Sequence, residues 1–142
     1  MLGHTSCGGL TAAVEAMLNP SAYMELVHSP EMRSMVDSLL VGVRMASQAL
    51  RQEGGEDVAS RPGYRDALID VSAAANAAIN AHVLSHAIDL DVAFGVFDLE
   101  SRSVGLASEE GWTPGLADPP HGNDQISEML RHYAAWSLGR LE

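Results

Sequence analysis

The stretch of this sequence with the most chemical potential lies near its N-terminus and reads Gly3-His4-Thr5-Ser6-Cys7-Gly8-Gly9. His4 and Cys7 are three residues apart, and an imidazole nitrogen and a thiolate sulfur are both ligands of tetrahedral zinc. The glycines after Cys7 allow a sharp turn and a close approach of a ligand to the backbone. A glycine-rich connection with an incidental thiol fits the same spacing, so spacing alone leaves both interpretations open.

The elements around this stretch would position it at the end of a strand. The apolar residues Met1–Gly3 are typical of a strand, and residues 10–18 have the apolar spacing of a helix, with Leu10, Ala13, Val14 and Met17 on one face. This arrangement places Cys7 near a helix N-terminus, where the helix dipole stabilises a thiolate. Because a domain rarely starts so close to such a turn, we expect further strands upstream of Met1.

Two long helices are predicted in the middle of the chain. Ser29-Pro30-Glu31 is a typical helix start, with an N-cap serine, a proline in the first turn and an acid near the positive end of the dipole. The apolar period continues to Gly54-Gly55, which ends the helix. After a polar linker over residues 56–62, a second helix is predicted from Tyr64 to Ile88. Its alanine-rich interior favours close packing on more than one side.

The last third of the sequence changes to a β pattern and ends in a helix. Residues 91–99 contain alternating β-formers, and residues 103–106 are predicted to form a short return strand after a turn. Residues 109–123 are rich in Gly and Pro and are predicted to form an irregular loop, followed by an amphipathic helix over residues 126–138. This order of elements predicts an α/β fold that lacks its N-terminal strands.

Composition limits the classes of partner. The chain has 142 residues, 46% of them hydrophobic and 19% charged, which is typical of one folded domain. The net charge of −11, with arginine as the only basic residue besides histidine, argues against binding to nucleic acid or an anionic membrane surface. We find no uninterrupted apolar run of roughly 18 residues and no signal peptide pattern. The single cysteine rules out an internal disulfide, so we expect a reducing, cytoplasmic location.

Other chemistries find less support in the sequence. His82 and His86 are four apart on a predicted helix and could share a metal, although partly buried histidines with hydrogen-bond partners are the more ordinary interpretation. A thiol phosphatase needs Arg six residues after its Cys, and here that residue is Ala13. The absence of lysine excludes a phosphate-binding P-loop, and the absence of a second Cys excludes a redox-active dithiol within the chain.

The stretch from Gly3 to Leu10, between a predicted strand and a predicted helix, resembles the second zinc-binding motif of the β-class carbonic anhydrases. The helix that ends near Ile88 and the segment Phe94–Ser101 resemble a later helix, strand and turn of that family. The resemblance implies that His4 and Cys7 are zinc ligands and that Gly8 lines the substrate end of the site. It also implies a mostly parallel sheet flanked by helices, with residues 1–142 as the C-terminal part of a single domain.

The family's first motif, Cys-x-Asp-Ser-Arg, has no counterpart in this sequence. That motif supplies another zinc thiolate and an Asp–Arg pair, so the resemblance implies half of a site and no catalytic residue in this chain. The implied function is zinc-dependent, reversible hydration of CO2 to bicarbonate by a homodimer or higher homo-oligomer. One alternative is a non-catalytic interaction subunit of the same fold. Another is a thiol-dependent enzyme with Cys7 as nucleophile and His4 as base.

Overall fold

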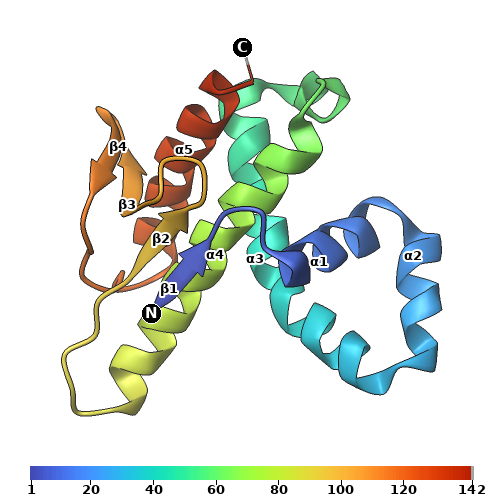
Figure 1. The fold of residues 1–142 in the computed structure, drawn as a ribbon, viewed down its shortest axis with the longest axis horizontal. Coiled ribbons are helices and arrows are strands. Elements are labelled where there is room, and N and C mark those ends of the chain that lie inside the picture. Colours follow the sequence, from blue (N-terminus) through green and yellow to red (C-terminus); the bar gives the residue numbers. More distant parts are fainter. Residues whose placement is uncertain (142) are drawn as a thin grey trace.

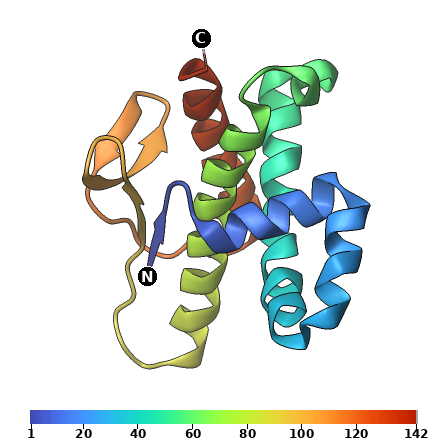
Figure 2. The same cartoon turned by 45° about the vertical axis from the view of Figure 1, so that its right-hand side comes forward.

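The structure, a computed structural model, describes residues 1–141, apart from the side chain of Val27. Three long helices, α3 (Pro30–Gly54), α4 (Tyr64–Ala87) and α5 (Asn123–Gly139), pack side by side and form the main layer (Figure 1). A small sheet packs against α4 and α5, and Figure 2 shows the helices gathered on one side of it. The fold is therefore α/β, as predicted.

The sheet contains the strands β1 (Leu2–His4), β2 (Gly95–Asp98), β3 (Ser103–Ser108) and β4 (Gly111–Pro114), in the order β1-β2-β3-β4. Within residues 1–141, β1 and β2 are parallel and the other two pairs are antiparallel. The prediction of a mostly parallel sheet is therefore wrong. Parallel pairing requires a long crossover, and here the helical layer provides one only between β1 and β2, whereas tight turns join the later strands.

Helix α4 lies at the centre of the molecule and contacts α1 (Gly8–Leu18), α3, α5 and the first two strands. Its alanines are almost fully buried, which confirms the predicted close packing: Ala73, Ala74, Ala75, Ala77 and Ala78. By length and hydropathy α4 would suffice to cross a membrane, although it contains no uninterrupted apolar run of that length. In this fold, 61% of its apolar window is buried inside the molecule. The same pattern is found in the central helices of folded domains.

Strand β1 lies directly on α4 because Gly3 has no side chain. A Cβ atom at Gly3 would be 2.7 Å from the carbonyl oxygen of Ala73 and 3.3 Å from the Cβ of Ala77. Gly3 also pairs with Val96 in β2, which is fully buried. The glycine therefore fixes how closely the strand before the His–Cys turn approaches the central helix.

The predicted helices form close to their expected limits. Helix α1 ends at Leu18, and α3 begins at Pro30 with Glu31 in its first turn, as predicted. Ser29 is the N-cap residue of α3, but its hydroxyl makes no capping hydrogen bond within the described part of the chain. Gly55, with a φ of 85°, ends α3.

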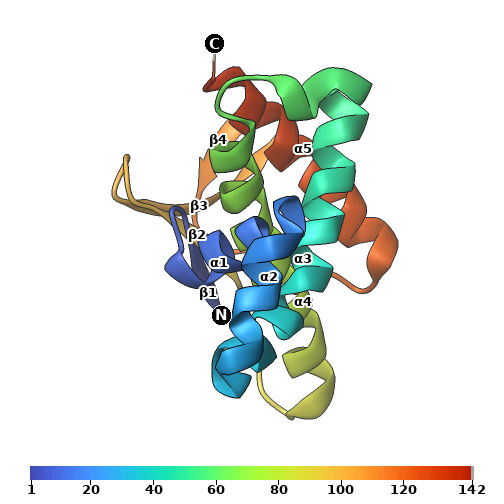
Figure 3. The same ribbon diagram turned by 90° about the vertical axis from the view of Figure 1, so that its right-hand side faces the viewer.

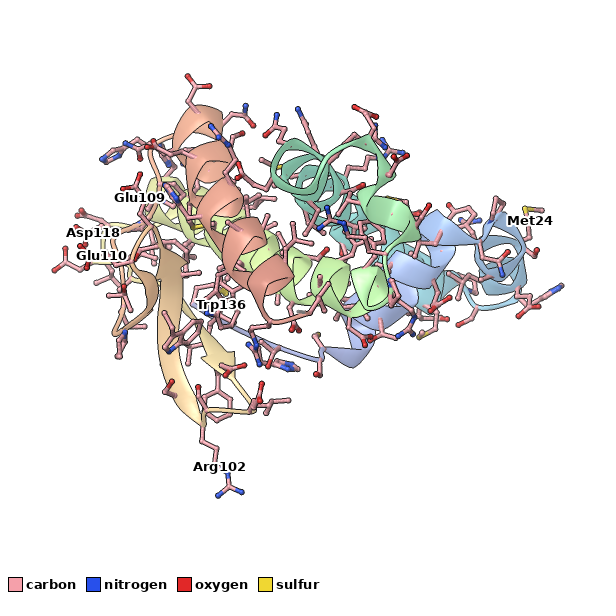
Figure 4. The ribbon with its side chains drawn as sticks, turned by 90° about the horizontal axis from the view of Figure 1, so that it is seen from above. Met24, Arg102, Glu109, Glu110, Asp118 and Trp136 are labelled. Carbon is pink, nitrogen blue, oxygen red and sulfur yellow. The ribbon has the colours of Figure 1, made fainter. Side chains whose placement is uncertain are left out.

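Two short helical segments were missed. Asn19 ends α1 and also begins α2 (Pro20–Glu25), because its side chain accepts a hydrogen bond from the Ser21 amide at 3.1 Å. A single turn of 3-10 helix, η1 (Leu26–His28), follows it. Helix α1 packs on α3, and α2 packs on α1; both lie in front of α3 in the view of Figure 3. In Figure 4, Met24 on α2 lies at the opposite end of the molecule from the hairpin of β2 and β3.

Two segments predicted to be irregular are also ordered. The expected linker contains a 3-10 helix, η2 (Glu56–Ser60), in which Val58 is buried in the core. The expected loop contains β4, which pairs with β3 and carries Trp112. The indole nitrogen of Trp112 donates to the Ser103 hydroxyl at 2.9 Å, so this tryptophan fastens the hairpin.

Candidate metal site at the first strand-to-helix turn

The His–Cys stretch has the predicted strand–turn–helix geometry. Strand β1 ends at His4, and α1 begins at Gly8, so Cys7 is the N-cap residue of α1 (Figure 1). The carbonyl oxygen of Cys7 accepts hydrogen bonds from the amide and hydroxyl of Thr11, at 2.8 and 2.9 Å. The turn therefore places Cys7 at the N-terminal end of α1, where the helix dipole is positive.

The His4 side chain is exposed and has one of its two nitrogens engaged. Its Nδ1 lies 3.0 Å from the carbonyl oxygen of Thr5. A carbonyl oxygen can only accept a hydrogen bond, so Nδ1 carries the proton in this contact and Nε2 keeps its lone pair. A backbone carbonyl that fixes the tautomer in this way is the usual support of a metal-ligating histidine.

The donors suit zinc, but they are too few for a complete site. His4 offers an imidazole nitrogen, and Cys7, which is half-buried and packs against the core, offers the only sulfur ligand of thiolate type in the chain. A catalytic zinc has three protein ligands. Among residues 1–141, no group of three or more His, Cys, Asp or Glu side chains is placed to hold a metal ion. His4 and Cys7 therefore fit as part of a zinc coordination sphere.

Gly8, which the resemblance places at the substrate end of the site, is exposed. A Cβ atom at this position would meet no atom of the described residues within 4 Å. The backbone beside Cys7 is therefore accessible to a small molecule.

A half-buried acid on α4, Asp70, holds the middle of the turn. Ser6 has a φ of 54°, in the left-handed region that non-glycine residues seldom adopt, and its amide donates to Oδ1 of Asp70 at 3.0 Å. Burial raises the pKa of Asp70, whereas the Ser6 amide and the positive charge of Arg140 oppose that rise. Asp70 thus stabilises a strained conformation between the two candidate ligands.

The residue before Ser6 is fastened to the end of β2. The Thr5 amide donates to the carbonyl oxygen of Phe97 at 3.0 Å, and the Thr5 hydroxyl accepts from the Leu99 amide at 2.9 Å. The same hydroxyl donates to Oδ1 of Asp98 at 3.4 Å. Thr5 is almost fully buried, so these bonds lock the turn onto the parallel pair of strands.

Asp98 forms an ion pair beneath the turn. Its side chain is 4% exposed, and Nη1 of Arg140 lies 3.4 Å from its Oδ1, while Oδ2 accepts from the Ser101 amide at 2.9 Å. Burial works against ionisation of Asp98, but the hydrogen bonds from Ser101 and the charge of Arg140 outweigh it and lower the pKa. Arg140 also pairs with Glu100 and lies over the ring of Trp136.

We predict that Asp98→Asn weakens the fold and flattens its response to acid. Because the pKa of Asp98 is lower in the folded chain than its ordinary value of 3.8, its stabilising effect is complete above that value and is lost as pH falls through the folded pKa. The free energy of unfolding should drop by about 1–2 kcal/mol at neutral pH and by less below about pH 4. Chemical denaturation at a series of pH values measures both effects, and parallel pH profiles for the two proteins would contradict this role.

The second candidate pair, His82 and His86, is engaged with backbone. Nδ1 of His82 lies 2.7 Å from the carbonyl oxygen of Pro120, and Nδ1 of His86 lies 2.8 Å from that of His82. The two rings are 4.5 Å apart. The ordinary interpretation of hydrogen-bonded histidines therefore describes this pair, and no third His, Cys, Asp or Glu of residues 1–141 joins them in a metal-binding group.

Sequence reasoning missed the residues that support the turn. Asp70 resembles any polar residue of an amphipathic helix, and Arg140 has no local signal at all. Asp98 carried a weak local signal in the sequence, because an acid at the end of a strand and three residues before Ser101 is typical of a side-chain-capped turn.

Comparison of this chain with family models, with curated proteins and with solved structures found no match. The likeness of the His4–Cys7 turn to the β-class carbonic anhydrases is therefore an expectation from the sequence. The function has to be argued from the residues and their geometry.

Proposed function

We propose that this chain contributes to a zinc-dependent lyase of the β-carbonic anhydrase type, which interconverts CO2 and bicarbonate. The observation that supports the proposal is the position of two residues of zinc-binding type, His4 at the end of β1 and Cys7 at the N-cap of α1, on the two sides of one short turn. His4 keeps the lone pair of Nε2 because Nδ1 contacts the Thr5 carbonyl, and Cys7 occupies the N-cap of α1. Asp70 and Thr5 hold the backbone between them.

Each group has a defined task in this proposal. Zinc, when bound, would supply Lewis-acid activation of water at about neutral pH. His4 would offer Nε2 as a nitrogen ligand, and Cys7 at the N-cap of α1 would offer the sulfur ligand. Gly8 would leave the backbone open to a molecule as small as CO2.

A small cavity supports access to the turn. Its volume is about 260 Å³, and its lining includes Ser6 from the turn and Thr11 from α1. Arg65, Asp66 and Asp70 from α4 form the opposite wall. Ser6 is the one residue of the turn that lines this cavity, which therefore lies beside the turn, and neither His4 nor Cys7 is part of its lining.

The proposed site needs a further thiolate and an Asp–Arg pair from outside residues 1–141. Another chain or a further segment of the same polypeptide would have to provide them, because a second copy of this sequence carries no Cys-x-Asp-Ser-Arg motif. One observation favours a second candidate function, a non-catalytic interaction subunit of the same fold. The described residues contain no group of three His, Cys, Asp or Glu side chains placed to hold a metal ion, whereas a catalytic zinc requires three protein ligands.

Metal analysis combined with a CO2-hydration assay on the purified chain tests both candidates. The lyase predicts stoichiometric zinc and hydration at least about tenfold above the buffer rate, which corresponds to about 1.4 kcal/mol of barrier lowering. Stoichiometric zinc without hydration would instead support the interaction subunit. A chain with neither zinc nor activity would show that the lyase proposal is wrong.

A further inference from the structure

Helix α5 presents two buried hydroxyl groups with no partner. Tyr133 and Ser137 lie four residues apart on one face of the helix and are 0% and 4% exposed. Within residues 1–141, neither Oη of Tyr133 nor Oγ of Ser137 makes a hydrogen bond. Leaving a buried hydroxyl unpaired is energetically costly, and folded proteins rarely tolerate it.

The same face of α5 looks toward the two acids beneath the His–Cys turn. Burial, together with the charges of Asp70 and Asp98, raises the pKa of Tyr133, so its hydroxyl keeps its proton at all ordinary pH values. Arg140, one turn beyond Ser137, reaches Asp98. The unpaired hydroxyls therefore lie on the part of α5 that packs against α4 and β3 and whose C-terminal end reaches Asp98 through Arg140.

Aromatic rings separate this region from bulk water. The ring of Tyr133 lies 5.2 Å from that of Trp136 and 6.4 Å from that of Trp112, and the two tryptophans stack at 5.1 Å. In Figure 4, Trp136 lies between α5 and the hairpin. With this side closed by apolar rings, the two hydroxyls have to find their partner inside the molecule.

We propose that Tyr133 and Ser137, together with Asp70 and Asp98, form a buried site for one internal water molecule that ties α5 to the His–Cys turn. A water can accept from both hydroxyls and donate to both carboxylates, and these four bonds are the number that internal waters typically make. A metal cation fits less well, because it accepts no hydroxyl proton and Arg140 already supplies a positive charge at Asp98. The link to the turn runs through Asp70, which binds the Ser6 amide.

The water site is inferred from the two unpaired hydroxyls and does not depend on the proposed function. Only the relevance of the site to metal binding at the His–Cys turn rests on that function. Tyr133→Phe tests the water site, because the variant keeps the ring and removes the hydroxyl. The direction in which the thermal midpoint changes is the result that decides. If a water pairs with the hydroxyl, the thermal midpoint should fall by about 3–5 °C. If the hydroxyl is truly isolated, its removal should leave the midpoint unchanged or raise it, and that result would overturn the proposal.

The other tyrosines supply matched controls. Tyr64→Phe removes a buried hydroxyl that lies 3.2 Å from the Ser47 hydroxyl and should also lower the midpoint. Tyr23→Phe removes an exposed hydroxyl bonded to Asp37 and should change little. Ser137→Ala should lower the midpoint by itself, but combined with Tyr133→Phe it should cost less than the sum, because both hydroxyls bind the same water. Simple additivity would contradict a shared water.

Two NMR readouts separate the water site from its link to the turn. The wild-type chain should show cross-relaxation between a long-lived water and the ring protons of Tyr133, and Tyr133→Phe should lose it; no such contact in the wild type would overturn the site. The Ser6 amide should exchange at least about tenfold faster in Tyr133→Phe than in Tyr23→Phe. Unchanged Ser6 exchange would overturn the link. Neither readout needs a metal, so a failure of the lyase proposal would leave both outcomes interpretable.

Discussion

Replacing Cys7 by serine should abolish zinc binding by this chain. A serine hydroxyl does not ionise near neutral pH and cannot replace a thiolate ligand, and the sequence contains no other cysteine. We expect the affinity for zinc to fall by at least about 100-fold, more than the loss from removing a group that only orients a ligand. Titration with Co²⁺ measures the effect directly, because the thiolate charge-transfer band should disappear.

A matched variant identifies which histidines take part. His4→Ala should reduce Co²⁺ affinity in the same direction as Cys7→Ser, whereas His82→Ala should leave the spectrum intact, since Nδ1 of His82 contacts the Pro120 carbonyl far from the turn. Undiminished metal content in Cys7→Ser would point instead to His82 and His86 as the binding pair.

Adding a single methyl group at Gly3 should have the largest effect on stability. The new Cβ would lie 2.7 Å from the backbone oxygen of Ala73, and a helix backbone cannot move away from it as a flexible side chain could. Gly3→Ala should therefore lower the free energy of unfolding by about 1–3 kcal/mol, the usual cost of overpacking. Urea denaturation measures the loss.

Gly139→Ala is the control for this substitution. A Cβ atom at Gly139, at the end of α5, would meet no atom of residues 1–141 within 4 Å. Its effect should stay within about 0.5 kcal/mol of zero. Equal midpoints for the two variants would show that β1 does not pack on α4 as closely as we describe.

Local patterns predicted most elements of this fold. The spacing of Leu10, Ala13 and Val14 identified α1, and all three side chains are buried. The direction of the strands was predicted wrongly, because the expected parallel sheet was taken from the resemblance to the β-class carbonic anhydrases and not from the local sequence. The short turns after Asp98 and Ser108 allow only antiparallel pairing, and this information was present in the sequence.

The missed elements depend on context. Proline commonly follows the end of a helix, but it is also favoured in a first helical turn, and Pro20 begins α2 with Asn19 as its cap. Strand β4 begins with Gly111 and ends with Pro114, residues that weaken a strand prediction, and it forms because β3 offers a partner edge.

Of the candidate site, the sequence predicted only the residues that are close together along the chain. His4 and Cys7 were found because their spacing lies within one turn. Their supports could not be found in the same way, since Asp70 is 64 positions from Ser6 and Asp98 is 93 positions from Thr5. Only the packing of α4 and β2 against the turn brings these carboxylates to it.

The parallel pairing of β1 with β2 sets the order in which the molecule assembles. The contact between Thr5 and Asp98 closes a loop of 93 positions, and such distant contacts form late in folding because the entropy of loop closure must be overcome first. Most of the helical layer forms from nearer contacts. During synthesis, the turn that carries His4 and Cys7 would therefore be fixed only after β2 has left the ribosome. In the finished protein, a local detachment of the three-residue β1 would release both donors without melting the helices.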